Sequence, residues 1–115
     1  MLTGALVLFA LTACGGLYLA YNHVILKVRP PIAIALLHGA AAATALTMVL
    51  IELYQMESQP MLLLASVSCF AVAALGGLLM FSYRRSKSRP PLVLILAHVL
   101  AAAAGVFCLA LWQFQ

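Results

Sequence analysis

The sequence predicts an all-α integral membrane protein, a four-helix up-down-up-down bundle built from two tandem two-helix repeats. Three observations support this fold class. The 115-residue chain is 67% hydrophobic and only 7% charged, which is unlike a soluble domain. It contains four apolar stretches near the roughly 20 residues that span a bilayer. Segments of its first half recur in its second half at a nearly constant offset. We therefore predict one transmembrane domain, residues 1–115, with repeat halves 1–57 and 58–115.

Charged or proline-containing connections bound the expected spans. Pro-Pro pairs precede the second and fourth spans, and proline is tolerated in a first helical turn, where its missing N–H would have no partner anyway. The first span contains Leu11-Thr12-Ala13-Cys14, which looks like a lipoprotein cleavage box. No basic residue precedes it, and cleavage would leave the span too short, so we expect a retained helix. The spans are expected at residues 2–22, 32–51, 61–83 and 92–112.

Basic residues gather in two of the three connections. The connection between the second and third spans has two glutamates and no lysine or arginine. By the positive-inside rule, we expect loops 23–31 and 84–91 to face the cytoplasm and both termini to lie outside, in a bacterial inner membrane. Topology then explains the net charge of +4, and we expect no nucleic-acid partner.

The most informative recurrence places one histidine in each half. Residues 29–38 and 89–98 share one pattern, Arg-Pro-Pro followed by an apolar helix that contains His38 or His98. Each histidine is six residues into its span, roughly 9 Å from the cytoplasmic boundary at 1.5 Å per residue. The two histidines are therefore expected at one depth.

Glycine doublets recur upstream of these segments. Gly15-Gly16-Leu17 pairs with Gly76-Gly77-Leu78 at an offset of 61, against 60 for the histidines. One inserted residue in the first basic turn accounts for the difference. The second glycine of each doublet lies six residues before the end of its span, so we expect it at the depth of the histidines.

This arrangement suits a haem. In an up-down-up-down bundle the second and fourth spans are diagonal, so their histidines would face each other across the core. Low-spin haem iron takes one axial ligand on each face, and neutral imidazole is a good ligand. Glycines on the other two walls would leave room for the porphyrin, and arginines at the cytoplasmic edge would meet its propionates. The candidate cofactor-binding residues are His38, His98, Gly16, Gly77, Arg29 and Arg89, with the two histidines as metal ligands.

The pattern resembles the haem-binding four-helix core of membrane b-type cytochromes. This likeness is one of architecture, and it implies one non-covalent haem b held by His38 and His98, with Gly16 and Gly77 as packing positions. Quinol-oxidising cytochromes b have two histidines on each ligand helix, whereas each helix here has one. No Cys-x-x-Cys-His run is present, so covalent attachment is not expected. The three cysteines lie in apolar spans, where a free thiol behaves as a small apolar group.

Three functions follow from these observations. The leading hypothesis is a membrane electron-transfer protein or redox-complex subunit, rather than a stand-alone enzyme, with a redox partner subunit or quinone and the lipid bilayer around it. A second hypothesis is a cofactor-free accessory subunit of an oligomer or larger membrane complex, in which the histidines only pack. A small transporter is the third hypothesis. Small multidrug exporters of this size use a glutamate in their first span, whereas the first span of this chain has no acidic residue.

Overall fold

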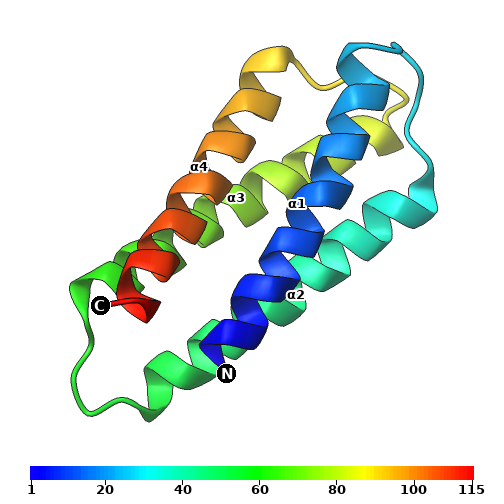
Figure 1. Cartoon of the computed structure of the whole chain (residues 1–115). Coiled ribbons are helices and arrows are strands. Elements are labelled where there is room, and N and C mark those ends of the chain that lie inside the picture. Colours follow the sequence, from blue (N-terminus) through cyan, green and yellow to red (C-terminus); the bar gives the residue numbers. More distant parts are fainter. The chain divides into compact units, whose positions relative to one another are not determined.

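The computed structural model describes residues 1–115, and all its regular elements are α-helices (Figure 1). Each of the four helices is long and apolar enough to cross a membrane. The expected all-helical membrane architecture is confirmed to this extent. The helices are α1 (Leu2–Val24), α2 (Ile32–Gln55), α3 (Met61–Arg85) and α4 (Leu92–Gln113).

The helices begin where proline predicts and end later than hydropathy predicts. Helices α2, α3 and α4 start directly after Pro31, Pro60 and Pro91. Helix α2 runs to Gln55, four residues past the expected end at Ile51. A helix is maintained by backbone hydrogen bonds, so polar residues at the membrane edge continue it after the apolar stretch has ended.

The chain forms two compact units, each a pair of packed helices. The first unit, Met1–Met56, is α1 packed against α2, and the second unit, Glu57–Gln115, is α3 packed against α4. In the first unit the N-terminal amine lies 3.4 Å from Glu52 Oε2, whereas Gly16 lies beside His38. Residues early in α1 thus meet residues late in α2, and the pair is antiparallel.

The turn inside each unit has one lysine in a left-handed backbone conformation. The φ angle is 53° at Lys27 and 58° at Lys87. In each turn the residue after that lysine donates its backbone N–H across 3.0 Å to a carbonyl near the end of the preceding helix, that of Asn22 or Tyr83. Lys27 comes five positions after Asn22, whereas Lys87 comes four positions after Tyr83. The additional residue of the first unit therefore lies in this turn.

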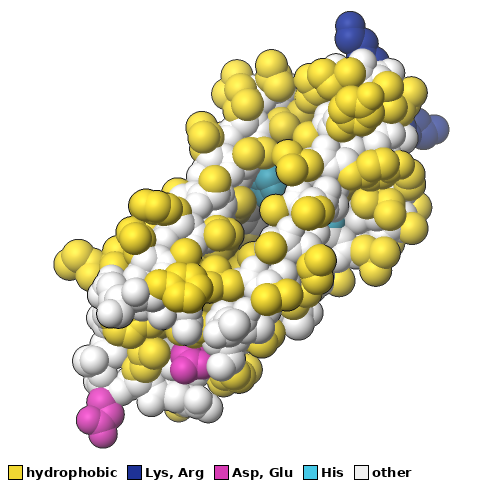
Figure 2. All heavy atoms as spheres, in the orientation of Figure 1, with side chains coloured by type: hydrophobic (Ala, Val, Ile, Leu, Met, Phe, Trp, Pro, Cys, Tyr) yellow, Lys and Arg dark blue, Asp and Glu magenta, His cyan; other side chains and the backbone are white.

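Each unit buries only a narrow strip between its helices. Large apolar side chains elsewhere remain exposed within the chain, such as Leu17 at 67% and Leu78 at 69%, and hydrophobic groups cover most of the surface seen in Figure 2. Such helices need lipid or other protein around them, because in water this surface would be costly. The buried strip comprises Leu2, Ala5, Phe9, Thr12, Asn22, Ala45 and Val49 in the first unit, and Leu63, Ser66, Phe70, Ala73, Ile95, Gly105 and Leu109 in the second.

Candidate functional site

In the first unit, the His38 ring of α2 lies against the backbone of α1. Its Nδ1 atom is 2.9 Å from the carbonyl oxygen of Thr12. A carbonyl only accepts hydrogen bonds, so Nδ1 carries the hydrogen and donates it. The side chain is half-buried. His38 thus ties the two helices together through a hydrogen bond between a side chain and the backbone.

The glycine doublet of α1 makes room for this ring. A Cβ atom added at Gly16 would lie only 2.9 Å from His38 Cε1, 3.4 Å from Nδ1 and 3.8 Å from Nε2. A Cβ added at Gly15 would make only ordinary contacts, at 3.9 Å from the same side chain. Gly16 is therefore the position at which the ring requires the absence of a side chain.

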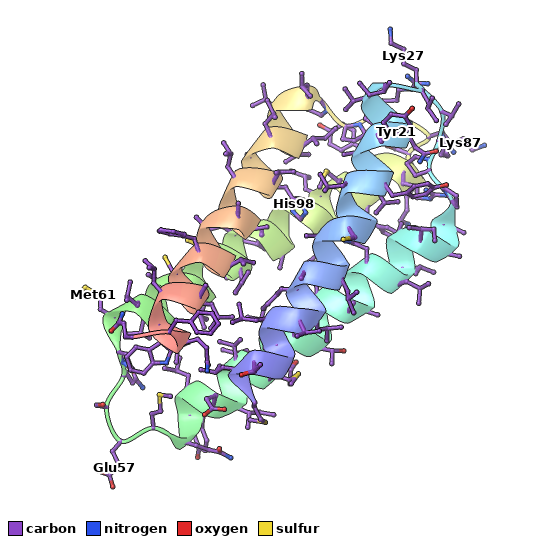
Figure 3. All side chains as sticks on the ribbon, viewed as in Figure 1. Tyr21, Lys27, Glu57, Met61, Lys87 and His98 are labelled. Atoms are coloured by element: carbon purple, nitrogen blue, oxygen red, sulfur yellow. The ribbon has the colours of Figure 1, made fainter.

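The second unit repeats this arrangement. His98 Nδ1 is 2.7 Å from the carbonyl oxygen of Ala73, and the half-buried ring lies between α3 and α4 (Figure 3). A Cβ added at Gly77 would lie 3.4 Å from His98 Cε1, and one added at Gly76 would lie 3.4 Å from His98 Cβ. The contacts on this doublet are at the short limit of ordinary van der Waals contact and are looser than the one at Gly16.

We call each of these clusters a histidine seat. In both seats the accepting carbonyl lies four residues before the second glycine, so helical geometry also pairs that carbonyl with the N–H of the glycine. The ring is thus hydrogen-bonded to the same helical turn that it covers. The first seat comprises Thr12, Gly15, Gly16 and His38, and the second comprises Ala73, Gly76, Gly77 and His98.

The seats give the glycines a different neighbour from the one expected. Sequence reasoning assigned Gly16 and Gly77 to the walls around a porphyrin. In the structure the group closest to each doublet is an imidazole of the same unit. The depth matching holds within each unit, since each histidine lies level with its own doublet. The accepting carbonyls of Thr12 and Ala73 were missed, because a backbone acceptor has no signature in the sequence.

The other candidate residues lie apart from the seats. Arg29 and Arg89 are exposed in the turns, nine residues before the histidine that follows each of them. No three His, Cys, Asp or Glu side chains gather into a group that would hold a metal ion. The three cysteines are free thiols.

The seats suit two chemical roles. A neutral imidazole that donates from Nδ1 carries its lone pair on Nε2, and metal-binding histidines commonly make such a bond to a backbone carbonyl. The same bond is also an interhelical hydrogen bond of the kind that joins membrane helices. Comparison of the chain with protein-family models, with curated proteins and with solved structures finds no match. The geometry of the seats is therefore the basis for the functional argument.

Proposed function

We propose that the protein is a membrane electron-transfer subunit that binds one haem b between His38 and His98. The observation that carries the proposal is the pair of matched seats. Both histidines donate from Nδ1 to a backbone carbonyl, at 2.9 Å and 2.7 Å. In the neutral form of such a ring, Nε2 is the nitrogen left to coordinate a metal. A task that needs two equivalent imidazoles accounts for both seats at once.

The proposal includes a finer fold than four separate spans. The two units are taken as tandem repeats of one helical hairpin, arranged up-down-up-down so that each contributes one axial ligand. Burial supports the repeat, because several buried residues of α1 correspond to buried residues of α3 that lie 61 positions later in the sequence. These pairs are Leu2 with Leu63, Ala5 with Ser66, Phe9 with Phe70 and Thr12 with Ala73.

The haem would supply one-electron transfer, and the chain would supply its position and surroundings. Two histidine ligands leave the iron no open position, so the protein exchanges electrons and does not activate oxygen. In this proposal the basic turns face the cytoplasm of a bacterial inner membrane, with Arg29 and Arg89 available to the propionates. The redox partner is another membrane subunit or a quinone, because a single haem near one surface does not cross about 30 Å of hydrocarbon.

A second candidate is a cofactor-free accessory subunit of a larger membrane complex. The specific observation in its favour is that each seat is already a complete interhelical contact, with a hydrogen bond and a ring packed on glycine. Such bonds stabilise membrane helix pairs by about 0.6–1.7 kcal/mol. In this case the histidines hold the hairpins together and bind nothing.

Asparagine separates these two roles. Its amide nitrogen occupies the place of imidazole Nδ1 and donates a hydrogen bond, but nothing replaces Nε2 as a metal ligand. His38→Asn and His98→Asn therefore keep the seat bond and remove the iron ligand. His38→Leu and His98→Leu remove both. His23→Asn changes the remaining histidine, which lies outside the proposed ligand pair, and is the matched control.

The deciding experiment is a reduced-minus-oxidised visible spectrum of purified protein expressed with ample haem. For haem binding we expect a low-spin spectrum in the wild type and in His23→Asn. We expect its loss in His38→Asn and His98→Asn, although both variants remain folded. A colourless wild type, with asparagine variants as stable as wild type and leucine variants less stable, would support the accessory subunit and overturn the haem proposal.

A further inference from the structure

The seats constrain the chemistry of the histidines before any ligand binds. An imidazole in water exchanges its hydrogen between Nδ1 and Nε2, and the hydrogen bond made by one nitrogen decides which form persists. Here the partner of Nδ1 is a helix carbonyl, that of Thr12 or Ala73. A helix carbonyl cannot rotate or donate. It therefore stabilises only a ring that is protonated at Nδ1.

The glycine contact fixes which edge of the ring faces the helix. At Gly16 an added Cβ would approach Cε1 and Nδ1 more closely than Nε2, at 2.9 and 3.4 Å against 3.8 Å. At Gly77 the order is the same for the two nearest ring atoms, with Cε1 at 3.4 Å and Nδ1 at 3.8 Å. The Nδ1 edge thus faces the glycine helix in both units, and Nε2 is the nitrogen farther from it.

We propose that each seat selects the tautomer of its histidine, so that His38 and His98 are held as Nδ1–H imidazoles that coordinate only through Nε2. Gly16 acts as a positioning residue, because a Cβ there would lie 2.9 Å from the ring and keep it from the carbonyl four residues earlier. The ligand class is an iron porphyrin, or another metal complex that accepts imidazole through Nε2. The inference rests on the proposed function only in naming haem iron as that ligand.

The seat also explains why the two glycines of the first doublet are unequal. In the first unit the close approach is at Gly16, whereas Gly15 has only ordinary contacts. Gly39 follows His38 directly on α2, and an added Cβ there would meet no atom within 4 Å. Gly39→Ala therefore makes the same chemical change as Gly16→Ala, next to the same histidine, without entering the seat.

The test is ¹⁵N NMR of the full-length, haem-free protein with labelled histidine, in lipid nanodiscs at alkaline pH. One-bond N–H couplings show which ring nitrogen carries the hydrogen, and His23→Asn removes the third histidine signal. We expect Nδ1 protonated and Nε2 unprotonated at His38 and His98 in the wild type and in Gly39→Ala. We expect Gly16→Ala to return His38 to a mixture of tautomers while His98 stays unchanged.

Protonation of Nε2 in the wild type would overturn the inference without any variant, so a misfolded Gly16→Ala would not weaken the test. An unaltered His38 in a folded Gly16→Ala would also overturn it. Titration of the same nanodiscs with haemin tests the proposed function separately. If the Nδ1–H form is found and no haemin binds, the tautomer selection stands and the electron-transfer proposal fails.

Discussion

The two units agree at their histidines and differ farther along the same buried strip. Both place an imidazole on a glycine doublet with the same hydrogen bond. Toward the other end, the second unit has a buried Ser66 hydroxyl that donates to the carbonyl of Gly105 at 2.8 Å. The first unit has Ala5 and Ala45 at the corresponding positions, both fully buried. The units thus share many buried positions, including the identical pairs Leu2 with Leu63 and Phe9 with Phe70, but around Ser66 their chemistry differs.

This contrast distinguishes buried positions at which the two units have different residues from positions at which they have the same ones. Helix packing in membranes accepts many small residues, by dispersion contacts or by hydrogen bonds. The buried strip around Ser66 shows this tolerance, since alanine occupies the corresponding position in the first unit. The histidine seats show no such variation in their histidine and glycines. In the seats, histidine and both glycines recur at matching positions of the two units.

The largest effect is expected at Gly105, where the units differ most. A Cβ at this position would lie 2.7 Å from Phe70 Cε1, and Phe70 is itself only 5% exposed. Overpacking of this kind costs about 1–3 kcal/mol, partly offset by roughly 1 kcal/mol from the better helix propensity of alanine. We expect Gly105→Ala to destabilise the protein by up to about 2 kcal/mol, measured by unfolding in mixed micelles.

The first unit provides the control for this prediction. Ala45 already has a Cβ at the corresponding position and is fully buried. Ala45→Gly should therefore cost about 1 kcal/mol from helix propensity and about 0.8 kcal/mol more from the lost burial of its methyl group. A Gly105→Ala variant at least as stable as the wild type would show that Phe70 gives way and that the two strips accept the same residue.

A smaller effect is expected at the seats, with a difference between the units. Alanine at Gly16 would lie 2.9 Å from its histidine, whereas alanine at Gly77 would lie 3.4 Å away. The ring must shift in Gly16→Ala and lose its bond to Thr12, at a net cost of about 1–2 kcal/mol after the roughly 1 kcal/mol gained from the better helix propensity of alanine. We expect Gly77→Ala to cost less than half as much. The same unfolding measurement checks this order, and a reversed order would contradict the seat geometry.

A third effect tests the hydrogen bond found in the second unit alone. Ser66→Ala removes a buried interhelical bond and leaves the residue found at the matching position of the first unit. Bonds of this kind average about 0.6 kcal/mol and reach about 1.7 kcal/mol. Ser68→Ala is the control, because this exposed hydroxyl on the same helix donates within that helix, to the carbonyl of Leu64 at 2.9 Å. We expect Ser66→Ala to be destabilising and Ser68→Ala nearly neutral, and equal effects would argue against a role for the Ser66 bond in holding the helices together.

The sequence predicted the helices far better than it predicted their contacts. Composition and proline gave all four helices, with the starts of α2, α3 and α4 at the expected residues. The contacts between helices were harder to predict from the sequence. These helices are apolar on every side, so hydrophobic periodicity does not reveal which face of a helix packs against another helix. The matched doublets at Gly16 and Gly77 located the seats. That each doublet would receive the histidine of its own hairpin depends on helix rotation, which only the structure supplies.

The smallest expected effect concerns the turns, where the two units are alike. Lys27 and Lys87 have φ angles of 53° and 58°, a region that costs a residue with a Cβ about 1 kcal/mol relative to glycine. Lys27→Gly and Lys87→Gly should each stabilise their hairpin by about 0.5 kcal/mol, since the greater flexibility of glycine in the unfolded chain offsets part of the gain. Arg29→Gly and Arg89→Gly remove the same charge from the same turns without relieving a left-handed backbone, so they should not stabilise. The inserted residue of the first turn lies before Lys27, so the Lys-x-Arg-Pro-Pro segment that follows has the same length in both units. Equal gains at the two lysines would show that this segment also has the same backbone conformation in each unit, and unequal gains would show that the insertion alters it.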